Sequence, residues 1–195
     1  LPELDAAGED IEPLQAPGRG FERMALQRAV FDGLLAGDDA AAMQATLRAR
    51  GLLPSGPLGR RALAQVVREV RPYVDAFAQW RVDGEPTSLA LDVDIDGLRL
   101  HGRLGDVWSN GIARLRFGKP NGNSSIRNGL DWLLASAAGV DVAFVEVQDV
   151  GDLGIDAHVR PHISQDAAID ALRSLVVLRR DGLQQPLPFA PYSGW

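Results

Sequence analysis

The sequence predicts an α+β fold in which helices come first and a small mixed sheet flanked by helices follows. Three observations support this class. Apolar residues recur at helical spacing over residues 21–80, and they alternate with polar residues, as in strands, from about residue 87. The chain of 195 residues is 46% hydrophobic and 24% charged, which is typical of a folded domain with a core. We therefore expect one globular domain.

Caps, turns and periodicity divide the chain into elements. Asp38 or Asp39 can cap a second helix, and Ser164 can cap the last one. Asp96-Gly97 and Asn110-Gly111 are typical two-residue hairpin turns. The expected helices cover residues 21–36, 38–50, 60–80, 124–138 and 164–180, and the expected strands cover residues 89–95, 98–103, 112–117, 142–147 and 155–160.

The domain organisation follows from the same features. Residues 1–20 are rich in Asp, Glu, Gly and Pro, and we interpret them as a linker or peripheral tail. The domain itself covers residues 21–195, with a helical part over 21–86 and an α/β core over 87–195. Residues 51–59 hold two prolines and three glycines, which predicts a structured loop between the second and third helices.

The composition excludes several classes of protein. The absence of cysteine excludes disulfides, thiolate zinc sites and cysteine nucleophiles, and it favours the cytoplasm over an oxidising compartment. No apolar run approaches the roughly 20 residues that a membrane-spanning helix needs, so we expect no membrane partner.

The basic segment, residues 98–127, differs electrostatically from the rest of the chain. It carries a net charge of +5 in a chain of net charge −6, which leaves −11 for the remainder. Dense positive charge is what phosphate binding requires. An unpaired base could stack on the Trp at the end of the second strand. The candidate DNA-binding residues are Arg99, Arg103, Trp108, Arg114, Arg116, Lys119 and Arg127.

An alternative explanation of the same residues is structural. Closing the hairpin at Asp96-Gly97 places Asp94 opposite Arg99 and Asp92 opposite His101, so these acids would pair with the arginines on a solvated face. In this alternative Trp108 is a core residue. The Asp-x-Asp-x-Asp-Gly spacing also matches the first half of a calcium-binding EF-hand loop, but the twelfth position holds an Arg where a Glu is required.

A metal-dependent nuclease site is the catalytic hypothesis that the sequence allows to be tested. Such a site has Gly-x-x-Asp on one strand and Asp/Glu-x-Lys on the next, and its carboxylates hold magnesium at the scissile phosphate. Lys119 is the only lysine, and Phe117 stands where the carboxylate would be. Gly105 stands at the position of the first Asp, and Asp106 alone cannot build the site. The sequence therefore predicts no catalytic residue and no metal ligand.

Several motifs and their order resemble one known family. They cover most of the chain after Phe21, and the similarity depends on order and spacing more than on one rare signature. The motifs are Gly37-Asp38-Asp39, the run Arg50–Gly59 that contains Leu-Pro-x-Gly-x-x-Gly, the hairpin Leu91–Leu104, the strand Arg114–Arg116, the helix Ser125–Gly139 and the ending Gln185–Phe189. In these features the chain resembles the carboxyl-terminal domain of the exodeoxyribonuclease V gamma subunit, the RecC family.

The resemblance implies a degenerate nuclease-like fold of the PD-(D/E)xK type that lacks nuclease chemistry. It implies a scaffold within a heterotrimer whose beta subunit is a helicase and nuclease and whose alpha subunit is a second helicase. The implied roles are duplex splitting, DNA guidance and docking of the alpha subunit. No cofactor is implied for this domain, since the partner subunits use magnesium and ATP. The apolar carboxyl-terminal residues, Leu187, Pro188, Phe189, Tyr192 and Trp195, are expected to be buried against the rest of the subunit or a partner.

Two other functions remain open from the sequence. One is an active metal-dependent nuclease, which the missing carboxylates disfavour. The other is an unrelated protein-binding or ligand-binding module, which would predict one deep apolar pocket with a few converging polar groups.

Overall fold

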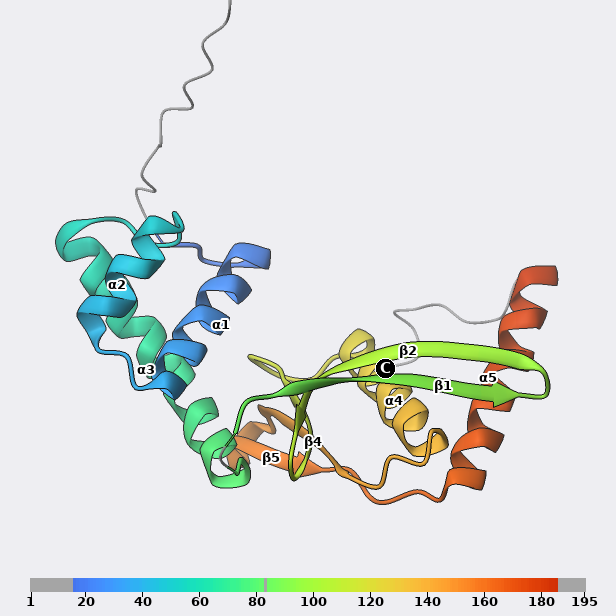
Figure 1. The fold of residues 1–195 in the computed structure, drawn as a ribbon. Coiled ribbons are helices and arrows are strands. Elements are labelled where there is room, and N and C mark those ends of the chain that lie inside the picture. Colours follow the sequence, from blue (N-terminus) through green and yellow to red (C-terminus); the bar gives the residue numbers. More distant parts are fainter. Residues whose placement is uncertain (1–15, 83, 186–195) are drawn as a thin grey trace, which may run out of the picture. The chain divides into compact units, whose positions relative to one another are not determined.

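The structure, a computed structural model, describes residues 16–82 and 84–185 (Figure 1). Contacts divide the chain into two units, Leu1–Asp75 and Ala76–Trp195. The expected linker falls mostly outside the described residues, as do the apolar residues at the carboxyl terminus. The boundary between the units lies inside a long helix, whose last turn belongs with the sheet.

The first unit is helical and contains α1 (Gly20–Ala36), α2 (Ala40–Ala49) and most of α3 (Gly56–Trp80). Helix α1 ends at Gly37, whose φ of 82° gives the left-handed ending that the sequence predicts. Between the two candidate caps of α2, the structure selects Asp39, which accepts a hydrogen bond from the backbone N–H of Ala42 at 2.8 Å. The buried core of this unit consists of Leu26, Val30, Phe31, Met43, Leu47, Leu53, Leu63, Val66, Val70, Tyr73 and Val74.

The loop between α2 and α3 is shorter than the sequence suggested, because α3 begins at Gly56 and not near residue 60. Pro57 is the second residue of the helix, where the missing N–H costs nothing because first-turn donors have no helical partner. At Gly59 a Cβ atom would lie 1.9 Å from the carbonyl oxygen of Pro54. Glycine is therefore required at position 59 for the chain to turn back this closely.

The second unit is built on a five-stranded mixed sheet of order β1-β2-β3-β4-β5. The strands β1 (Thr87–Ile95), β2 (Leu98–Trp108) and β3 (Gly111–Leu115) form an antiparallel meander. Strand β4 (Ala143–Asp149) is parallel to β3, and β5 (Ile155–Val159) is antiparallel to β4 after the short 3-10 helix η1 (Gly151–Leu153). The α+β class and the mixed sheet are confirmed.

The β1–β2 hairpin has the expected register, with Asp94 opposite Arg99 and Asp92 opposite His101. Its turn residues, Asp96 and Gly97, have φ values of 52° and 83°, which suit a two-residue hairpin turn. The hairpin is longer than expected, because β2 continues to Trp108.

A β-bulge explains how β2 continues beyond its expected end. Leu89 pairs with Leu104, whereas Thr87 pairs with Val107, so β2 contains one extra residue. Asp106, within the bulge, has a φ of 52°. The extra residue reverses the alternation of the faces, which turns Trp108 away from the face that Leu104 shares with α4.

Helices α4 (Gly122–Ala137) and α5 (Gln165–Gln184) cover one face of the sheet (Figure 1). Helix α4 begins before the expected residue 124 because Asn121 and Ser124 form a reciprocal capping box. Ser164 caps α5, as expected. The core beneath the two helices contains two clusters of buried residues: Leu91, Leu104, Ile112, Ala135 and Phe144, and Val93, Ile95, Ala137, Ala168 and Leu172. In the part of the chain that the structure describes, no helix has the length and apolar character needed to cross a membrane.

Candidate functional site

The basic segment extends over β2, β3, the following loop and the first half of α4. Two of its arginines, Arg99 and Arg103, lie on the exposed face of β2, opposite the face that packs on the helices. Arg99 pairs with Asp92, with Nη2 3.6 Å from the carboxylate, and His101 Nδ1 lies 3.7 Å from the same group. This is the solvated pairing that the structural alternative predicts for Arg99.

Arg114, on β3, lies on the face that α4 covers. Its Nε and Nη2 atoms lie 3.0 and 2.9 Å from a carboxylate oxygen of Asp131 on α4. Its Nη1 donates to the carbonyl oxygen of Gly105 on β2 at 2.8 Å, and the guanidinium lies 5.6 Å from the ring centre of Phe144. Only 15% of the side chain is exposed. The partner is therefore Asp131 and not Asp92 or Asp94, and the positive charge is neutralised inside the unit.

The remaining basic residues of the segment divide into two groups. Arg116 donates from Nε to the carbonyl oxygen of Lys119 at 2.8 Å, which closes the turn after β3. The side chains of Arg103, Lys119 and Arg127 are exposed, and within residues 16–82 and 84–185 none of them makes an ion pair or a side-chain hydrogen bond. We call these three the open cations, because they are exposed and have no such partner among the described residues, whereas Arg99 is exposed but paired with Asp92.

Trp108 is a packed residue. Its exposed fraction is 9%, and its ring contacts Phe77 edge-on, with a distance of 5.4 Å between ring centres. Arg81 lies over the indole at 5.3 Å. Stacking on an unpaired base, which the sequence suggested, would require the indole to leave these contacts.

The nuclease positions do not form a nuclease site, and of Gly105, Phe117 and Lys119 only Gly105 lies on a strand. Gly105, where the first carboxylate would be, contributes only its carbonyl oxygen, and Arg114 binds that oxygen. Lys119 follows the end of β3 in a loop and does not lie on the strand. Across the described residues, no three histidine, aspartate or glutamate side chains gather closely enough to hold a metal ion.

A buried polar cluster that the sequence did not predict joins β4, α4 and the chain directly after β5. Glu146, on β4, is 6% exposed. One carboxylate oxygen accepts a hydrogen bond from the Asn128 amide at 2.7 Å, and the other lies 2.7 Å from Nε of Arg160, an ion pair without hydrogen-bond alignment. The one signal available was a charged residue inside the otherwise apolar run from Phe144 to Val147. Both oxygens are occupied, so the cluster has a structural role.

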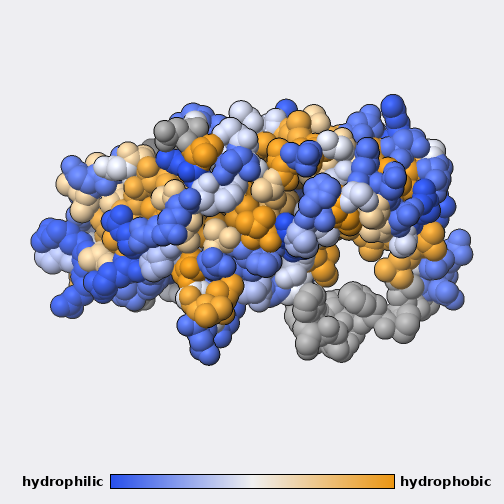
Figure 2. Space-filling view, turned by 90° about the horizontal axis from the view of Figure 1, so that it is seen from below, coloured by the Kyte–Doolittle hydropathy of each residue, from blue (hydrophilic) through white to orange (hydrophobic). Residues whose placement is uncertain are grey.

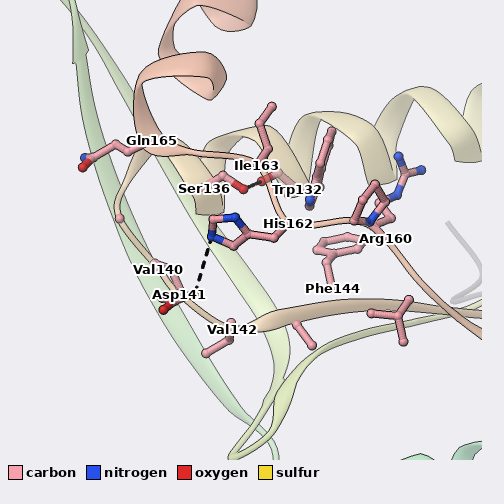
Figure 3. A pocket seen from close by; sticks show the side chains of 14 residues that line it. Trp132, Ser136, Val140, Asp141, Val142, Phe144, Arg160, His162, Ile163 and Gln165 are labelled. Carbon is pink, nitrogen blue, oxygen red and sulfur yellow. Dashed lines mark hydrogen bonds and ion pairs between the residues drawn. The ribbon is translucent and has the colours of Figure 1, made fainter.

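A cavity of about 390 Å³ lies beside this cluster, between α4 and the chain that links β5 to α5 (Figure 3). Trp132 and Phe144 form one wall, and Arg160 lies against both rings at 5.6 and 5.9 Å. At its rim His162 points toward Asp141, with 3.6 Å between Nε2 and a carboxylate oxygen, and these two side chains are 77% and 92% exposed. The cavity is thus open and partly polar, unlike the deep apolar pocket that a ligand-binding module would need.

Comparison with known proteins gives the family. A family model described as the RecC C-terminal domain matches residues 1–195. The RecBCD enzyme subunit RecC of Escherichia coli (strain K12) is 24% identical over 191 residues, which are 97% of this chain and 16% of that protein. The chain therefore spans only a small part of the length of this relative. A match along the whole chain shows that it belongs to the RecC C-terminal domain family.

Proposed function

We propose that this chain is a non-catalytic scaffold domain of a RecBCD-type helicase–nuclease complex that acts in double-strand break repair and recombination. In this proposal the domain helps to split the duplex, guides DNA and docks the other subunits. Its partners are the beta and alpha subunits and, in the assembled complex, DNA. Magnesium and ATP are used by those subunits, and the complex works in the cytoplasm. Family membership supports the proposal.

The observation that carries the non-catalytic role is the arrangement of Gly105, Arg114 and Asp131. We propose that the sheet derives from a metal-dependent nuclease, in which the ends of β2 and β3 would present carboxylates to magnesium. Here a guanidinium lies between the Gly105 carbonyl and the Asp131 carboxylate. A fixed positive charge at this place repels a divalent cation, and it pairs with the carboxylate of Asp131.

A cleavage assay tests this part of the proposal. The purified chain is expected to cut neither single-stranded nor double-stranded DNA in magnesium or manganese. The control is the variant Lys119→Ala. It removes the only lysine of the chain, and a lysine is the residue that orients the attacking water in such a nuclease site. Metal-dependent cleavage that survives repurification and disappears in Lys119→Ala would show that the domain is an active nuclease.

The DNA-guiding role rests on the three open cations. We propose that Arg103, Lys119 and Arg127 contact the phosphate backbone, because their charges are not neutralised by described neighbours. Contact by Arg99, Arg114, Arg116 or Trp108 stays a prediction, and it would require the bonds described above to open. The acidic surface of the rest of the chain opposes DNA binding by the chain alone.

The docking role is supported by apolar side chains on the second half of α5. Leu175, Val177, Leu178 and Leu183 are 39%, 51%, 50% and 72% exposed. Figure 2 shows apolar surface among the charged side chains at the right-hand end of the molecule, where α5 lies. Exposed apolar residues grouped on one helix are typical of a surface that another protein covers.

A further inference from the structure

Strand β1 is an edge of the sheet whose outer backbone groups have no partner among the described residues. It pairs with β2 on one side only. A two-residue turn makes Ile95 and Leu98 a hydrogen-bonded pair, so alternate residues from Ile95 back to Leu89 direct their N–H and C=O groups at β2. Ser88, Ala90, Asp92 and Asp94 therefore direct theirs outward, and all four residues are exposed.

The edge is long, and its protection is limited to the bulge opposite its Thr87 end and to the charges of Asp92 and Asp94. It extends over nine residues and contains no proline, glycine or lysine between Thr87 and Ile95. Natural sheets usually protect such an edge with prolines, lysines, bulges or a short strand, because free backbone groups are a template for another strand. At the opposite edge, β5 has only five residues and is followed closely by Pro161.

Charge distinguishes between possible occupants of the edge. Strand β1 carries two carboxylates, Asp92 and Asp94, and no basic residue. In an antiparallel pair of two β1 strands from two copies of this chain, these carboxylates would lie on one face beside their counterparts, which is unfavourable. A strand with basic residues at alternate positions would instead place its cations beside the acids, as Arg99 of β2 already does at 3.6 Å from Asp92.

We propose that β1 accepts an extended segment of a protein partner in which basic residues alternate with apolar ones, added as a sixth strand. The backbone groups of Ala90, Asp92 and Asp94 supply the hydrogen bonds, and the two carboxylates select the charge. This is β-strand addition, in which main-chain bonds give affinity and alternate side chains give specificity.

The test uses the 195-residue chain and two end-capped peptides of seven residues, one alternating lysine with valine and one alternating glutamate with valine. Amide hydrogen exchange is followed by NMR. The lysine peptide at saturation is expected to slow exchange of the Ala90, Asp92 and Asp94 amides by at least about tenfold, since a bonded amide exchanges only when it opens. The Leu91 and Val93 amides already bond to β2 and should change little. The glutamate peptide should protect none of them.

Two variants locate the effect on β1. Ala90→Pro removes one outward donor without removing a bond to β2, and it should abolish the protection. Ala157→Pro makes the same change at an outward position of β5 and should leave the protection intact. The double variant Asp92→Lys with Asp94→Lys keeps the backbone donors and should reverse the preference for the peptide. The glutamate peptide should then protect the amides, and the lysine peptide should not.

Several results would overturn the proposal. One is binding of the lysine peptide without the alternating pattern of protection, which would show attraction by charge alone. Equal protection by both peptides, or an unchanged preference in the double lysine variant, would remove the role of the carboxylates. Protection that rises with protein concentration in the absence of peptide would identify a second copy of the chain as the occupant.

Discussion

The side chain of Arg114 links three elements and places a positive charge beside the ends of β2 and β3. It joins β3 to the Gly105 carbonyl of β2 and to Asp131 of α4. Charge-assisted bonds of this kind are strong and directional. If the sheet derives from a nuclease, as we propose, the atoms that fix the helix on the sheet also occupy the place of the metal ion.

Another arginine, Arg173 of α5, binds Asp96 in the turn of the β1–β2 hairpin. Its Nε and Nη2 atoms donate to the two carboxylate oxygens of Asp96 at 2.6 and 3.1 Å. These hydrogen bonds hold the pKa of Asp96 below its ordinary value of 3.8. A depressed pKa means that the folded chain binds this proton less readily than the unfolded chain.

The variant Asp96→Asn tests this link through pH. Asn tolerates the positive φ of this turn position, so the backbone is kept. The wild-type chain should be the more stable of the two above pH 3.8, where unfolded Asp96 is ionised. The difference should then shrink as the pH falls through the lower folded pKa, because the carboxylate becomes protonated in both states. Thermal unfolding from pH 6 to pH 2.5 measures it. A difference that is independent of pH would contradict the ion pair.

At the scale of elements, the Leu-Pro-x-Gly-x-x-Gly run that carries the family resemblance has a geometric explanation. Leu53 is fully buried, and Gly56 has a φ of 64°, which suits glycine. Pro57 is the second residue of α3, and Gly59 packs directly on the carbonyl of Pro54. The motif is therefore the start of a helix folded tightly against the loop before it, and nothing in it points to a ligand.

Gly59→Ala is expected to destabilise the chain strongly. The new Cβ would lie 1.9 Å from a backbone oxygen, so the backbone must shift, at a cost of about 1–3 kcal/mol or more. Gly129→Ala is the matched control, because that glycine lies inside α4 with open space around its Cβ position. It should stabilise the chain by about 0.5–1 kcal/mol. Urea unfolding followed by circular dichroism measures both changes, and equal effects would refute the close packing at Gly59.

At the scale of the whole molecule, charge is distributed unevenly along the chain. The open cations belong to a basic segment, and the rest of the chain is acidic. The chain has a net charge of −6, yet Arg103, Lys119 and Arg127 belong to a segment of net charge +5. A field of this kind gives weak binding to DNA by the chain alone. In the proposed function, these cations add contacts to DNA that partner subunits already hold.

The salt dependence of DNA binding by the complete heterotrimer tests these contacts. Replacing Arg103, Lys119 and Arg127 with Ala should weaken binding of forked DNA and flatten the salt slope by roughly 0.7–0.9 for each phosphate contact that is lost. The control is a triple Ala variant of Arg48, Arg60 and Arg68. These three are exposed arginines of the helical unit, so the change in net charge is the same. If both triple variants keep the slope of the wild type, the basic segment does not contact DNA. If both flatten it equally, net charge and not position is responsible.

The sequence alone determined the features that neighbouring residues encode. Periodicity and caps predict the helices, and Asp96-Gly97 predicts the hairpin register, because a two-residue turn leaves a single pairing of the strands. The missing carboxylates before Lys119 and at Gly105 were also evident from the sequence. Each of these inferences depends on spacing along the chain, which is why they were accessible without coordinates.

Only the tertiary structure decided which distant groups meet. The sequence offered Asp92 and Asp94 as partners for the arginines, but α4 brings Asp131 to Arg114. The bulge in β2 turns Trp108 onto Phe77, and a one-residue insertion reverses every later side chain without any strong local signal. The buried contacts of Glu146 likewise come from distant groups, Asn128 of α4 and Arg160 directly after β5. Pair formation across elements depends on strand order and helix placement, which local patterns do not specify.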